Sequence, residues 1–315
     1  MGEKTNIEWC DSTVNPTTGC DGCELWNGRD IRICYAGNLH EGRLAKSIPK
    51  LYAPDFREVR LAPGRMMKAA RWPDLRGQER PDKPWLNGLP RMIFVGDMGD
   101  FMSRKVPDEY VKREIIGAIT SREGSRHFWL LLTKQIHRLF EFSLQLGGLP
   151  DNCMAMTTIT GQAVAGARIA DLTMVNCKWR GISAEPLWEE VVMPRETMGR
   201  CCGCQTCQFQ GWHQIAKPKI DWVIVGGQSG SDPKTFYLDH ARSMIAQCKA
   251  AGVDVFVKQL GAAASDEVNG VAGYALKVPQ EAAPLISLRL RDKKGGDINE
   301  WPPDLQIRQM PDVSR

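Results

Sequence analysis

Short, continuously apolar runs recur along this chain, and longer amphipathic segments separate them. Apolar runs of this kind are typical of strands that are buried on both faces of a parallel sheet. The amphipathic segments between them predict the helices that connect such strands. The strands that we expect are 6–9, 92–95, 127–132, 154–158, 181–183, 222–225 and 253–257. Seven strand–helix units predict an α/β fold, a parallel (β/α) barrel that is incomplete.

Two of the helices can be predicted in detail. One should begin at Pro107 and place its apolar residues on one face, namely Val111, Ile115 and Ile119. A second should be capped by Asp239, end at Gly252, and bury Ala241, Met244, Ile245 and Cys248. Cys248 is therefore expected to be a small core residue, and the same is expected of Cys153 and Cys177.

The length of the chain and its apolar segments limit the class of protein. A chain of 315 residues is long enough for one barrel of about 250 residues with insertions. It has no run of about 18 apolar residues, and its first residues lack the apolar core of a signal peptide. We therefore expect a cytoplasmic protein that has no membrane segment.

Cysteines are numerous and clustered. The chain has 11, an odd number, and most of them fall in two tight groups. An odd count without a secretion signal argues against a framework of disulfides. Clustered cysteines in a reducing compartment indicate metal binding instead.

The first group reads NPTTGCDGCELWNGRDIRICYAG and contains Cys20, Cys23 and Cys34. It follows the first expected strand, so it should form the first strand-to-helix loop. Three thiolates on one loop can hold three irons of a [4Fe–4S] cluster and leave the fourth iron open. The spacing is C-x2-C-x10-C. Zinc is the alternative, in which case Cys10 could supply a fourth thiolate.

Polar and glycine-rich turns follow several of the expected strands. In a parallel barrel, functional residues gather where strands end and loops begin. Any one of these turns is a weak signal, and their recurrence after successive strands is the stronger one. They are Gly96-Asp97-Met98-Gly99-Asp100, Thr133-Lys134, Ser183-Ala184-Glu185-Pro186, Gly226-Gly227-Gln228-Ser229-Gly230 and Lys258-Gln259.

These motifs, in this order, resemble the phage and prophage three-cysteine-motif family, which is regarded as radical-SAM-like. The opening TNIEWCDSTVNPTTGC, the strand-end motifs and the tail EWPPDL with Arg308 all resemble that family, so the resemblance covers nearly the whole chain. The usual radical SAM spacing is C-x3-C-x2-C, and this chain departs from it.

The resemblance implies a radical SAM barrel over 1–261. Within it, 1–50 would bind the cluster and 188–219 would be a cysteine-rich insertion, while 262–315 would be a C-terminal extension packing on the barrel. It implies S-adenosylmethionine (SAM) as cofactor, a 5′-deoxyadenosyl radical as hydrogen abstractor, and an external electron donor such as flavodoxin or ferredoxin. A phage-encoded protein would work in the host cytoplasm. The residues that the resemblance assigns to SAM are Gly96, Asp97, Met98, Asp100, Thr158, Ser183, Glu185, Gly226 and Gly227.

The second cysteine group lies between two expected strands. Cys201, Cys204 and Cys207 form C-x2-C-x2-C, with Cys202 among them and His213 six positions later. A structural zinc would hold an insertion that lacks its own core. An auxiliary iron–sulfur cluster is the second interpretation, and unliganded surface thiols are the third.

Basic and aromatic residues interleave in 51–72, where Arg57, Arg60, Arg65, Lys68 and Arg71 accompany Tyr52, Phe56 and Trp72. Such a stretch could follow a phosphate backbone and stack on bases. The alternative is a solvated helix face with core aromatics. The net charge of +4 permits a nucleic-acid partner without demanding one.

The phage resemblance implies a DNA or nucleotide substrate, with modification or isomerisation of a substituent on a nucleobase. Two alternatives stay open. One is a non-catalytic protein, stabilised by zinc or a cluster, that binds nucleic acid. The other is a radical SAM enzyme that acts on a small molecule.

Overall fold

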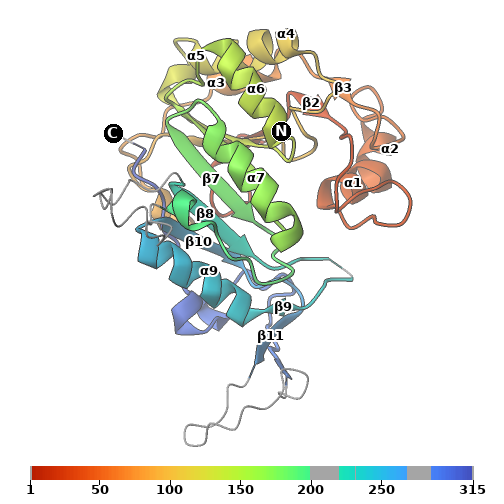
Figure 1. The fold of residues 1–315 in the computed structure, drawn as a ribbon. Helices are drawn as coiled ribbons and strands as arrows, with labels where there is room; N and C mark the ends of the chain where they lie inside the picture. Colours follow the sequence, from red (N-terminus) through yellow and green to blue (C-terminus); the bar gives the residue numbers. More distant parts are fainter. Residues whose placement is uncertain (1, 199–219, 231, 268–284, 314–315) are drawn as a thin grey trace, which may run out of the picture. The chain divides into compact units, whose positions relative to one another are not determined.

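A computed structural model describes residues 2–198, 220–230, 232–267 and 285–313 (Figure 1). The chain divides into two compact units. The first unit contains Met1–Thr158, Arg168–Gly181 and Met310–Arg315, and the second contains Ile159–Ala167 and Ile182–Gln309.

The described residues form a mixed α/β fold around a seven-stranded sheet. The strand order is β1-β4-β5-β6-β7-β8-β10, so the strands of this sheet lie side by side in the order in which they occur along the chain. The pairs β1–β4, β4–β5, β5–β6 and β8–β10 run parallel. An order that never reverses is consistent with a partial (β/α) barrel. The strands are β1 (Ser12–Val14), β4 (Met92–Val95), β5 (Phe128–Leu132), β6 (Cys153–Thr158), β7 (Trp179–Ala184), β8 (Trp222–Gly226) and β10 (Asp254–Gln259).

Six of the seven expected strands are confirmed, and their ends differ from the prediction by at most a few residues. Their apolar runs are buried as predicted: every residue of β4, β6 and β8 is buried. In the first unit the register pairs Met92 with Phe128 and Trp129 with Cys153. Consecutive buried residues in neighbouring strands fill both sides of the sheet, which explains why these segments lack a polar face.

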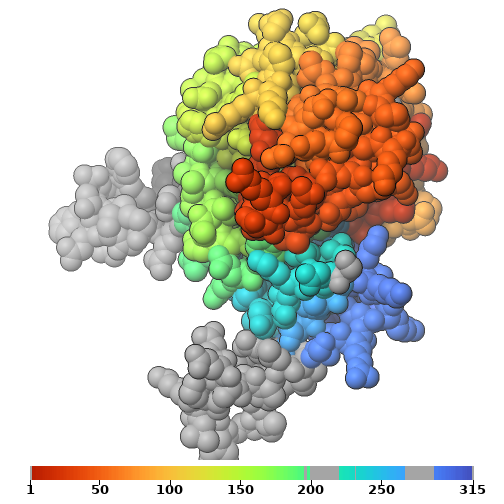
Figure 2. All heavy atoms as spheres, turned by 90° about the vertical axis from the view of Figure 1, so that its right-hand side faces the viewer, coloured from red at the N-terminus to blue at the C-terminus, as the bar shows by residue number. Residues whose placement is uncertain are grey.

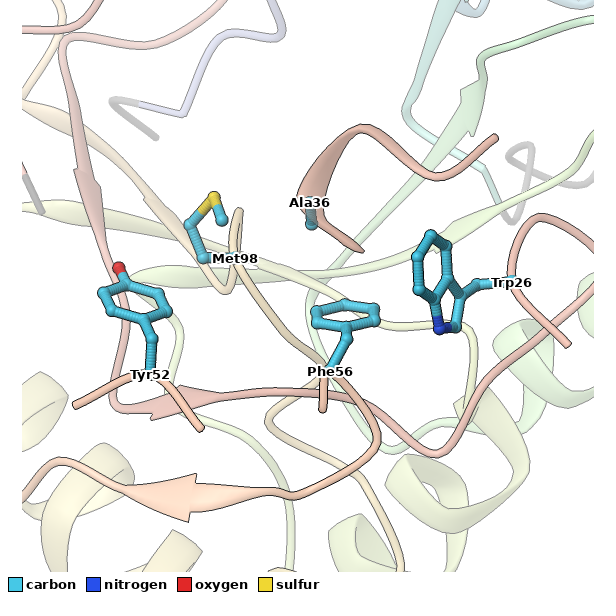
Figure 3. Close-up of a cluster of buried hydrophobic side chains, with 5 residues drawn as sticks. All are labelled: Trp26, Ala36, Tyr52, Phe56 and Met98. Atoms are coloured by element: carbon cyan, nitrogen blue, oxygen red, sulfur yellow. The ribbon is translucent and has the colours of Figure 1, made fainter. Parts of the chain in front are cut away.

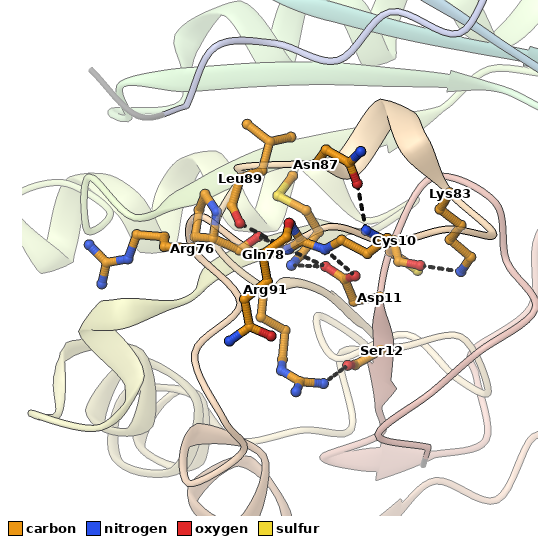
Figure 4. A network of polar contacts seen from close by, with 12 residues as sticks. Cys10, Asp11, Ser12, Arg76, Gln78, Lys83, Asn87, Leu89 and Arg91 are labelled. Carbon is orange, nitrogen blue, oxygen red and sulfur yellow. Dashed lines mark hydrogen bonds and ion pairs between the residues drawn. The ribbon is translucent and has the colours of Figure 1, made fainter.

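The expected strand 6–9 is wrong, because the first strand is β1, which begins at Ser12. Lys83 accounts for the difference (Figure 4). Its ammonium donates to the carbonyl oxygens of Thr5, Ile7 and Cys10 at 2.8, 2.7 and 2.6 Å. Three carbonyls that converge on one cation require a turned backbone, which cannot pair as a strand.

The two helices predicted in detail are confirmed, except that the second has a different capping residue. Residues 108–120 are helical, in α4 (Asp108–Tyr110), η3 (Val111–Ile116) and α5 (Gly117–Thr120), and the predicted apolar face is buried. The helix α9 (Leu238–Ala251) ends at Gly252, whose φ of 72° is left-handed, and it buries Cys248. It packs on β8 and β10 (Figure 1). Asp239 lies in its first turn and accepts from Arg242, whereas Tyr237 is the capping residue.

Other elements complete the two units. The first unit also contains β2 (Thr17–Thr18), α1 (Tyr35–Leu39), η1 (His40–Leu44), α2 (Ala45–Ser47), β3 (Arg60–Leu61), α3 (Arg65–Ala70), η2 (Pro84–Leu86), η4 (Gly124–Arg126) and α6 (Ile136–Leu146). Helix α7 (Gln162–Met174) has residues in both units. The second unit also contains η5 (Arg195–Met198), β9 (Phe236–Tyr237), β11 (Ala264–Glu267), β12 (Leu285–Ser287), η7 (Ile298–Glu300) and η8 (Pro303–Leu305).

The C-terminal residues of the second unit pack on its strands. Val257 of β10 donates from its backbone to Ile307, and the Trp222 indole donates to the carbonyl of Gln309 at 2.9 Å. The Arg308 guanidinium lies 5.6 Å from the ring centre of Phe256. Among the helices of the described residues, none has the length and apolarity that a membrane crossing requires.

Acid should destabilise the first unit through His127. This side chain is 1% exposed, and burial lowers its pKa from 6.5 to about 4. Between these two values the unfolded chain binds a proton that the folded chain does not. Stability should therefore fall as the pH drops below 6.5, by at most about 1.4 kcal/mol per pH unit. Chemical denaturation at pH 7 and pH 5 measures this loss. His127→Gln should reduce the loss, and an unchanged loss would contradict the assignment; His137→Gln, at an exposed histidine, is the control.

Candidate functional site

The loop after β1 is pressed against the segment that precedes β3. Strand β2 pairs antiparallel with β3, and the amide of Cys20 donates to the carbonyl of Phe56 at 2.9 Å. Gly19 has a φ of 84°, and a Cβ atom there would lie 2.4 Å from the carbonyl oxygen of Glu58. Only glycine combines this backbone angle with so close an approach. The position of the Cys20 backbone is thus fixed by its hydrogen bond to Phe56 and by the close contact of Gly19 with Glu58.

The turn after β4 lies beside the same loop. Gly19 and Gly99 form a parallel bridge, and a Cβ on Gly99 would lie 2.6 Å from the carbonyl oxygen of Gly19. The side chain of Asn15 accepts from the amide of Met98 at 3.0 Å. Because parallel strands end at one edge of a sheet, residues after β1 and β4 meet there. The cysteine loop and the Gly96–Asp100 turn are therefore neighbours within the first unit.

The ten residues between Cys23 and Cys34 fold back on themselves. The Asn27 side chain accepts from the amides of Arg29, Asp30 and Ile31 at 2.8, 2.8 and 3.0 Å, which turns the chain. The carbonyl of Leu25 then accepts from the amides of Ile33 and Cys34, both at 3.1 Å. Cys34 therefore returns to Leu25, which lies two residues after Cys23 in the sequence, and the ten-residue spacing is a closed excursion.

An apolar cluster lies under this loop (Figure 3). Its buried members are Trp26, Ala36, Tyr52, Phe56 and Met98, and Cys20 and Cys34 pack against it. The rings of Trp26 and Phe56 meet edge to face, with their centres 5.4 Å apart. Two of the three cysteines thus have an apolar wall on one side, which shields them from water.

Two carboxylates of the loop fasten it to the rest of the first unit. Asp21 accepts from the hydroxyl of Ser103 at 2.8 Å and from the amide of Arg104 at 2.6 Å. Glu24 accepts both arms of Arg168, at 2.7 and 2.8 Å. Burial raises the pKa of Glu24, but the hydrogen bonds and charge of Arg168 outweigh it and lower the pKa to about 2. Arg168 also donates to the carbonyl of Thr158 at 2.9 Å, so it joins the loop to the end of β6.

The electrostatics of the cysteines are dominated by burial. It raises the pKa of Cys20 to about 12, and the charge of Asp100 adds to this rise. Burial also raises the pKa of Cys23. Lys134, at the end of β5, acts in the opposite sense on both thiols. Lys134 is therefore the side chain that favours thiolates here, the form in which cysteine binds metals.

Asp97 and Asp100 have different environments in one turn. The carboxylate of Asp100 accepts from the amide of Met102, the hydroxyl of Thr133 and the amide of Lys134, at 2.9, 2.6 and 2.9 Å. These hydrogen bonds of Asp100 join the turn after β4 to the turn after β5. In contrast, the buried Oδ1 of Asp97 has no hydrogen-bond partner, and burial raises the pKa of this carboxyl. The side chain of Asn15 acts to lower the pKa of this carboxyl, against the effect of burial.

The predicted site residues of the second unit contact one another. Glu185 and Lys258 form an ion pair at 2.5 Å. A Cβ on Gly226 would lie 3.3 Å from the side chain of Glu185, and one on Gly227 would lie 2.3 Å from the carbonyl oxygen of Leu260. These glycines therefore permit close approach of the chain to itself. Ser183 is buried, and its carbonyl accepts from Ile159.

The remaining cysteines are divided between the core and the undescribed segments. Cys10 and Cys153 are fully buried, and Cys10 lies beside Lys83 (Figure 4). Cys177 is partly buried and donates to the carbonyl of Trp179. The second cysteine group falls outside the described residues: Cys201, Cys202, Cys204, Cys207 and His213.

The basic stretch 51–72 lies in the orange part of the face that Figure 2 shows. Its three aromatic side chains are buried, so they are not presented for stacking on bases. Arg57 pairs with Asp55 at 3.1 Å and Arg60 with Glu58 at 2.9 Å, and Arg65 is partly buried. The exposed cations of α3 and its C-terminal end are Lys68 and Arg71.

Several residues that shape the site were not singled out from the sequence. Asn27 closes the excursion, and Arg168 fastens the loop from 144 residues away. An Asn followed by Gly is a turn signal that could have identified the first. Nothing local marks Arg168, because its partner is distant in sequence.

Removing Arg168 should loosen the cysteine loop. Arg168→Gln leaves the Glu24 carboxylate without its bidentate partner, and we expect a loss of about 2 kcal/mol in the free energy of unfolding. Arg76→Gln is the matched control, because Arg76 is 55% exposed and its ion pair with Asp74 should contribute less than about 1 kcal/mol. Urea denaturation measures both variants, and equal losses would contradict the role of Arg168.

Within the described ranges, no three His, Cys, Asp or Glu side chains lie close enough together to hold a single metal ion. Neither a curated protein nor a solved structure matches the chain. One family model, described as "Protein of unknown function (DUF5131)", matches residues 4–298, so the chain belongs to that family.

Proposed function

We propose that this protein is a radical SAM enzyme that binds a [4Fe–4S] cluster through Cys20, Cys23 and Cys34. The observation that carries the proposal is the convergence of this loop with strand-end turns. The excursion between Cys23 and Cys34 closes on Leu25, and the loop bridges to the turn after β4 through Gly19 and Gly99. Sequence resemblance to a radical-SAM-like family supports the same chemistry.

The donor set suits such a cluster. Three thiols on one loop provide three ligands, and Cys10 contacts Lys83 in a different part of the first unit. A cluster separates its thiolate ligands further than a single ion does, so the three sulfurs need only surround a common space. The chemistry that a bound cluster would supply is one-electron reduction of SAM, with release of a 5′-deoxyadenosyl radical that abstracts hydrogen. The electron would come from a flavodoxin-like or ferredoxin-like donor.

The protein residues have distinct roles in this proposal. The unpartnered carboxylate oxygen of Asp97 would accept from the ammonium of SAM. Lys134 would stabilise the thiolates of Cys20 and Cys23 before the cluster assembles. The cluster of Trp26, Phe56 and their neighbours would exclude water from one side. Asp100 would hold the two turns in register.

We propose a nucleobase substituent in DNA as the substrate, which the enzyme modifies or isomerises. An unactivated C–H bond gives an acid or a base nothing to act on, whereas a carbon radical can remove its hydrogen. The exposed cations Lys68 and Arg71 would contact phosphates, since Arg57 and Arg60 are held by neighbouring carboxylates. Lys68→Ala with Arg71→Ala should then weaken DNA binding and reduce its dependence on salt.

The test uses anaerobically reconstituted, reduced protein with SAM and hypermodified phage DNA. Release of 5′-deoxyadenosine, with a digested nucleoside of changed mass or retention time, is the expected result. An isomerisation would return the abstracted hydrogen from 5′-deoxyadenosine to the product, so the nucleoside would keep its mass and shift its retention time without net release of 5′-deoxyadenosine. Zinc in place of iron, with DNA binding but no SAM cleavage, would favour a metal-stabilised binding protein. Reaction of free small molecules alone would overturn the DNA substrate and leave the radical chemistry.

A further inference from the structure

Positive charge is concentrated in the segment that follows Cys23. Residues 27–50 contain five Lys and Arg and two Asp and Glu, a net charge of +3, whereas the whole chain of 315 residues carries +4. One of the two acids, Glu41, is occupied within the protein, because it pairs with Arg32 at 3.2 Å and accepts from the amide of Phe56 at 3.0 Å. The exposed cations of the segment are Arg29, Arg32, Arg43, Lys46 and Lys50.

The same segment exposes apolar side chains. Ile31, Tyr35 and Ile48 are 39, 66 and 45% exposed, and they are three of the seven large apolar side chains that are exposed among the described residues. Single exposed apolar residues are ordinary, but several of them in one short segment indicate a contact surface for another macromolecule. Residues 27–50 thus combine the two properties of a docking surface, namely exposed apolar groups and an excess of one charge.

This segment lies next to the three cysteines of the loop, each of which is partly exposed. Cys34 is the capping residue of α1, and Tyr35 is the first residue of that helix. The ion pair between Arg32 and Glu41 joins the excursion to η1, and α1, η1 and α2 follow one another and are in contact. Helices α1 and α2 lie at the right of Figure 1, on the side that faces the viewer in Figure 2.

We propose that residues 27–50 form the docking surface for the electron donor, an acidic protein that carries single electrons. The proposal rests on the proposed function. The exposed cations would attract an acidic patch of the partner, and Ile31, Tyr35 and Ile48 would supply the apolar contact. The reduced partner would lose one electron, and the cluster at the adjoining cysteines would gain the same electron.

An acidic protein fits this surface better than a nucleic acid does. Phosphates would gain from the cations, but they would offer Ile31 and Ile48 no apolar surface. A protein interface, in contrast, combines an apolar centre with charged residues at its edge. Electron-transfer partners also bind weakly through small interfaces, which a short segment can provide. Lys68 and Arg71 lie outside residues 27–50, so the proposed contacts with DNA involve different side chains.

The probe is flavodoxin, and its binding to the anaerobically reconstituted full chain is measured at low and at high salt. Arg43→Glu with Lys46→Glu should weaken this binding about 10- to 100-fold at low salt, because two attractive charges become repulsive, and less at high salt. Reduction of the cluster by reduced flavodoxin should slow, whereas its reduction by dithionite should not change. Ile48→Ser should weaken binding about 10-fold at both salt concentrations, because it removes an apolar contact.

Lys112→Glu with Arg122→Glu is the matched control, because both residues are exposed outside residues 27–50 and the change in net charge is the same. Equal weakening by the two double variants would show that only the net charge matters, and would overturn the inference. Binding of a DNA duplex is measured in parallel. If the charge reversal weakens binding of the duplex and leaves flavodoxin binding unchanged, the surface belongs to nucleic acid and the inference is wrong.

The inference and the proposed function can fail separately. A protein that holds a cluster and is reduced by dithionite, but does not bind flavodoxin, would overturn the docking surface and leave the radical SAM proposal standing. A protein that acquires no cluster would overturn the proposed function, and the delivery of electrons with it. If the charge reversal lowers the iron content, it has disturbed the loop, and Ile48→Ser then decides whether the surface binds flavodoxin.

Discussion

Replacing Cys20, Cys23 and Cys34 together by alanine is expected to abolish iron binding by the loop and all cleavage of SAM. The three thiols are the only side chains of the loop that can ligate iron as thiolates. The fold should survive, because the loop is held independently of any metal by the Gly19–Gly99 bridge, by Asp21 and by the Glu24–Arg168 ion pair. Iron and sulfide content, visible absorbance and 5′-deoxyadenosine release measure the effect.

Cys248→Ala is the matched control for this prediction. Cys248 is fully buried in α9 of the second unit, so its replacement should cost about 1 kcal/mol of stability and leave the iron content unchanged. An iron content equal to that of the unchanged protein would place the cluster elsewhere. Stoichiometric zinc without iron, in protein produced with ample iron, would reject the cluster.

The strands could be predicted from the sequence where burial on both faces left an uninterrupted apolar run. Met92–Val95 is such a case, because all four residues are apolar and all are buried. The first strand could not be predicted in this way. Its sequence is Ser12-Thr13-Val14, and all three residues are buried. The Ser12 hydroxyl can be buried because it donates to the carbonyl of Glu3 and accepts from the Arg91 guanidinium. Partners that are distant in sequence made a polar segment into a buried strand.

The cysteine loop could be predicted to lie at a strand end, but its internal closure could not. The sequence shows a ten-residue gap, and only the structure shows that Asn27 and Leu25 return Cys34 to Cys23. The two carboxylates of the next turn are equally ambiguous in sequence. Thr133 and the amide of Lys134 occupy Asp100, and no comparable donors reach Oδ1 of Asp97. Which of two neighbouring acids joins the next turn depends on residues that follow another strand.

The aromatic and basic stretch 51–72 has a composition that fits two different uses. Tyr52 and Phe56 belong to the apolar cluster under the cysteine loop, and burial raises the pKa of Tyr52 while the charge of Arg65 acts to lower it. A composition that suits nucleic-acid binding therefore builds a wall of the candidate cofactor site. Sequence order alone does not distinguish these uses, because both need aromatic and cationic side chains.

Among the glycines of the loop, Gly19 is the one whose replacement by alanine is expected to damage the site most. A Cβ there would lie 2.4 Å from the carbonyl oxygen of Glu58, and φ is 84°. Two costs are therefore combined, one from the left-handed backbone and one from the contact with a backbone atom that cannot rotate away. Displacement of Gly19 would also break its bridge to Gly99 and move Cys20, so cluster content should fall with stability.

Gly64→Ala separates these two costs. Gly64 has a similar φ of 78°, but no atom lies within 4 Å of the position that its Cβ would take. Its replacement should cost about 1–2 kcal/mol for the backbone angle alone. Gly19→Ala should cost about 1–3 kcal/mol more than that, as overpacking does. Denaturation of both variants gives the difference, and iron content shows whether it is confined to the cysteine loop. If the two variants are equally stable and hold equal iron, the close approach at Gly19 does not position Cys20.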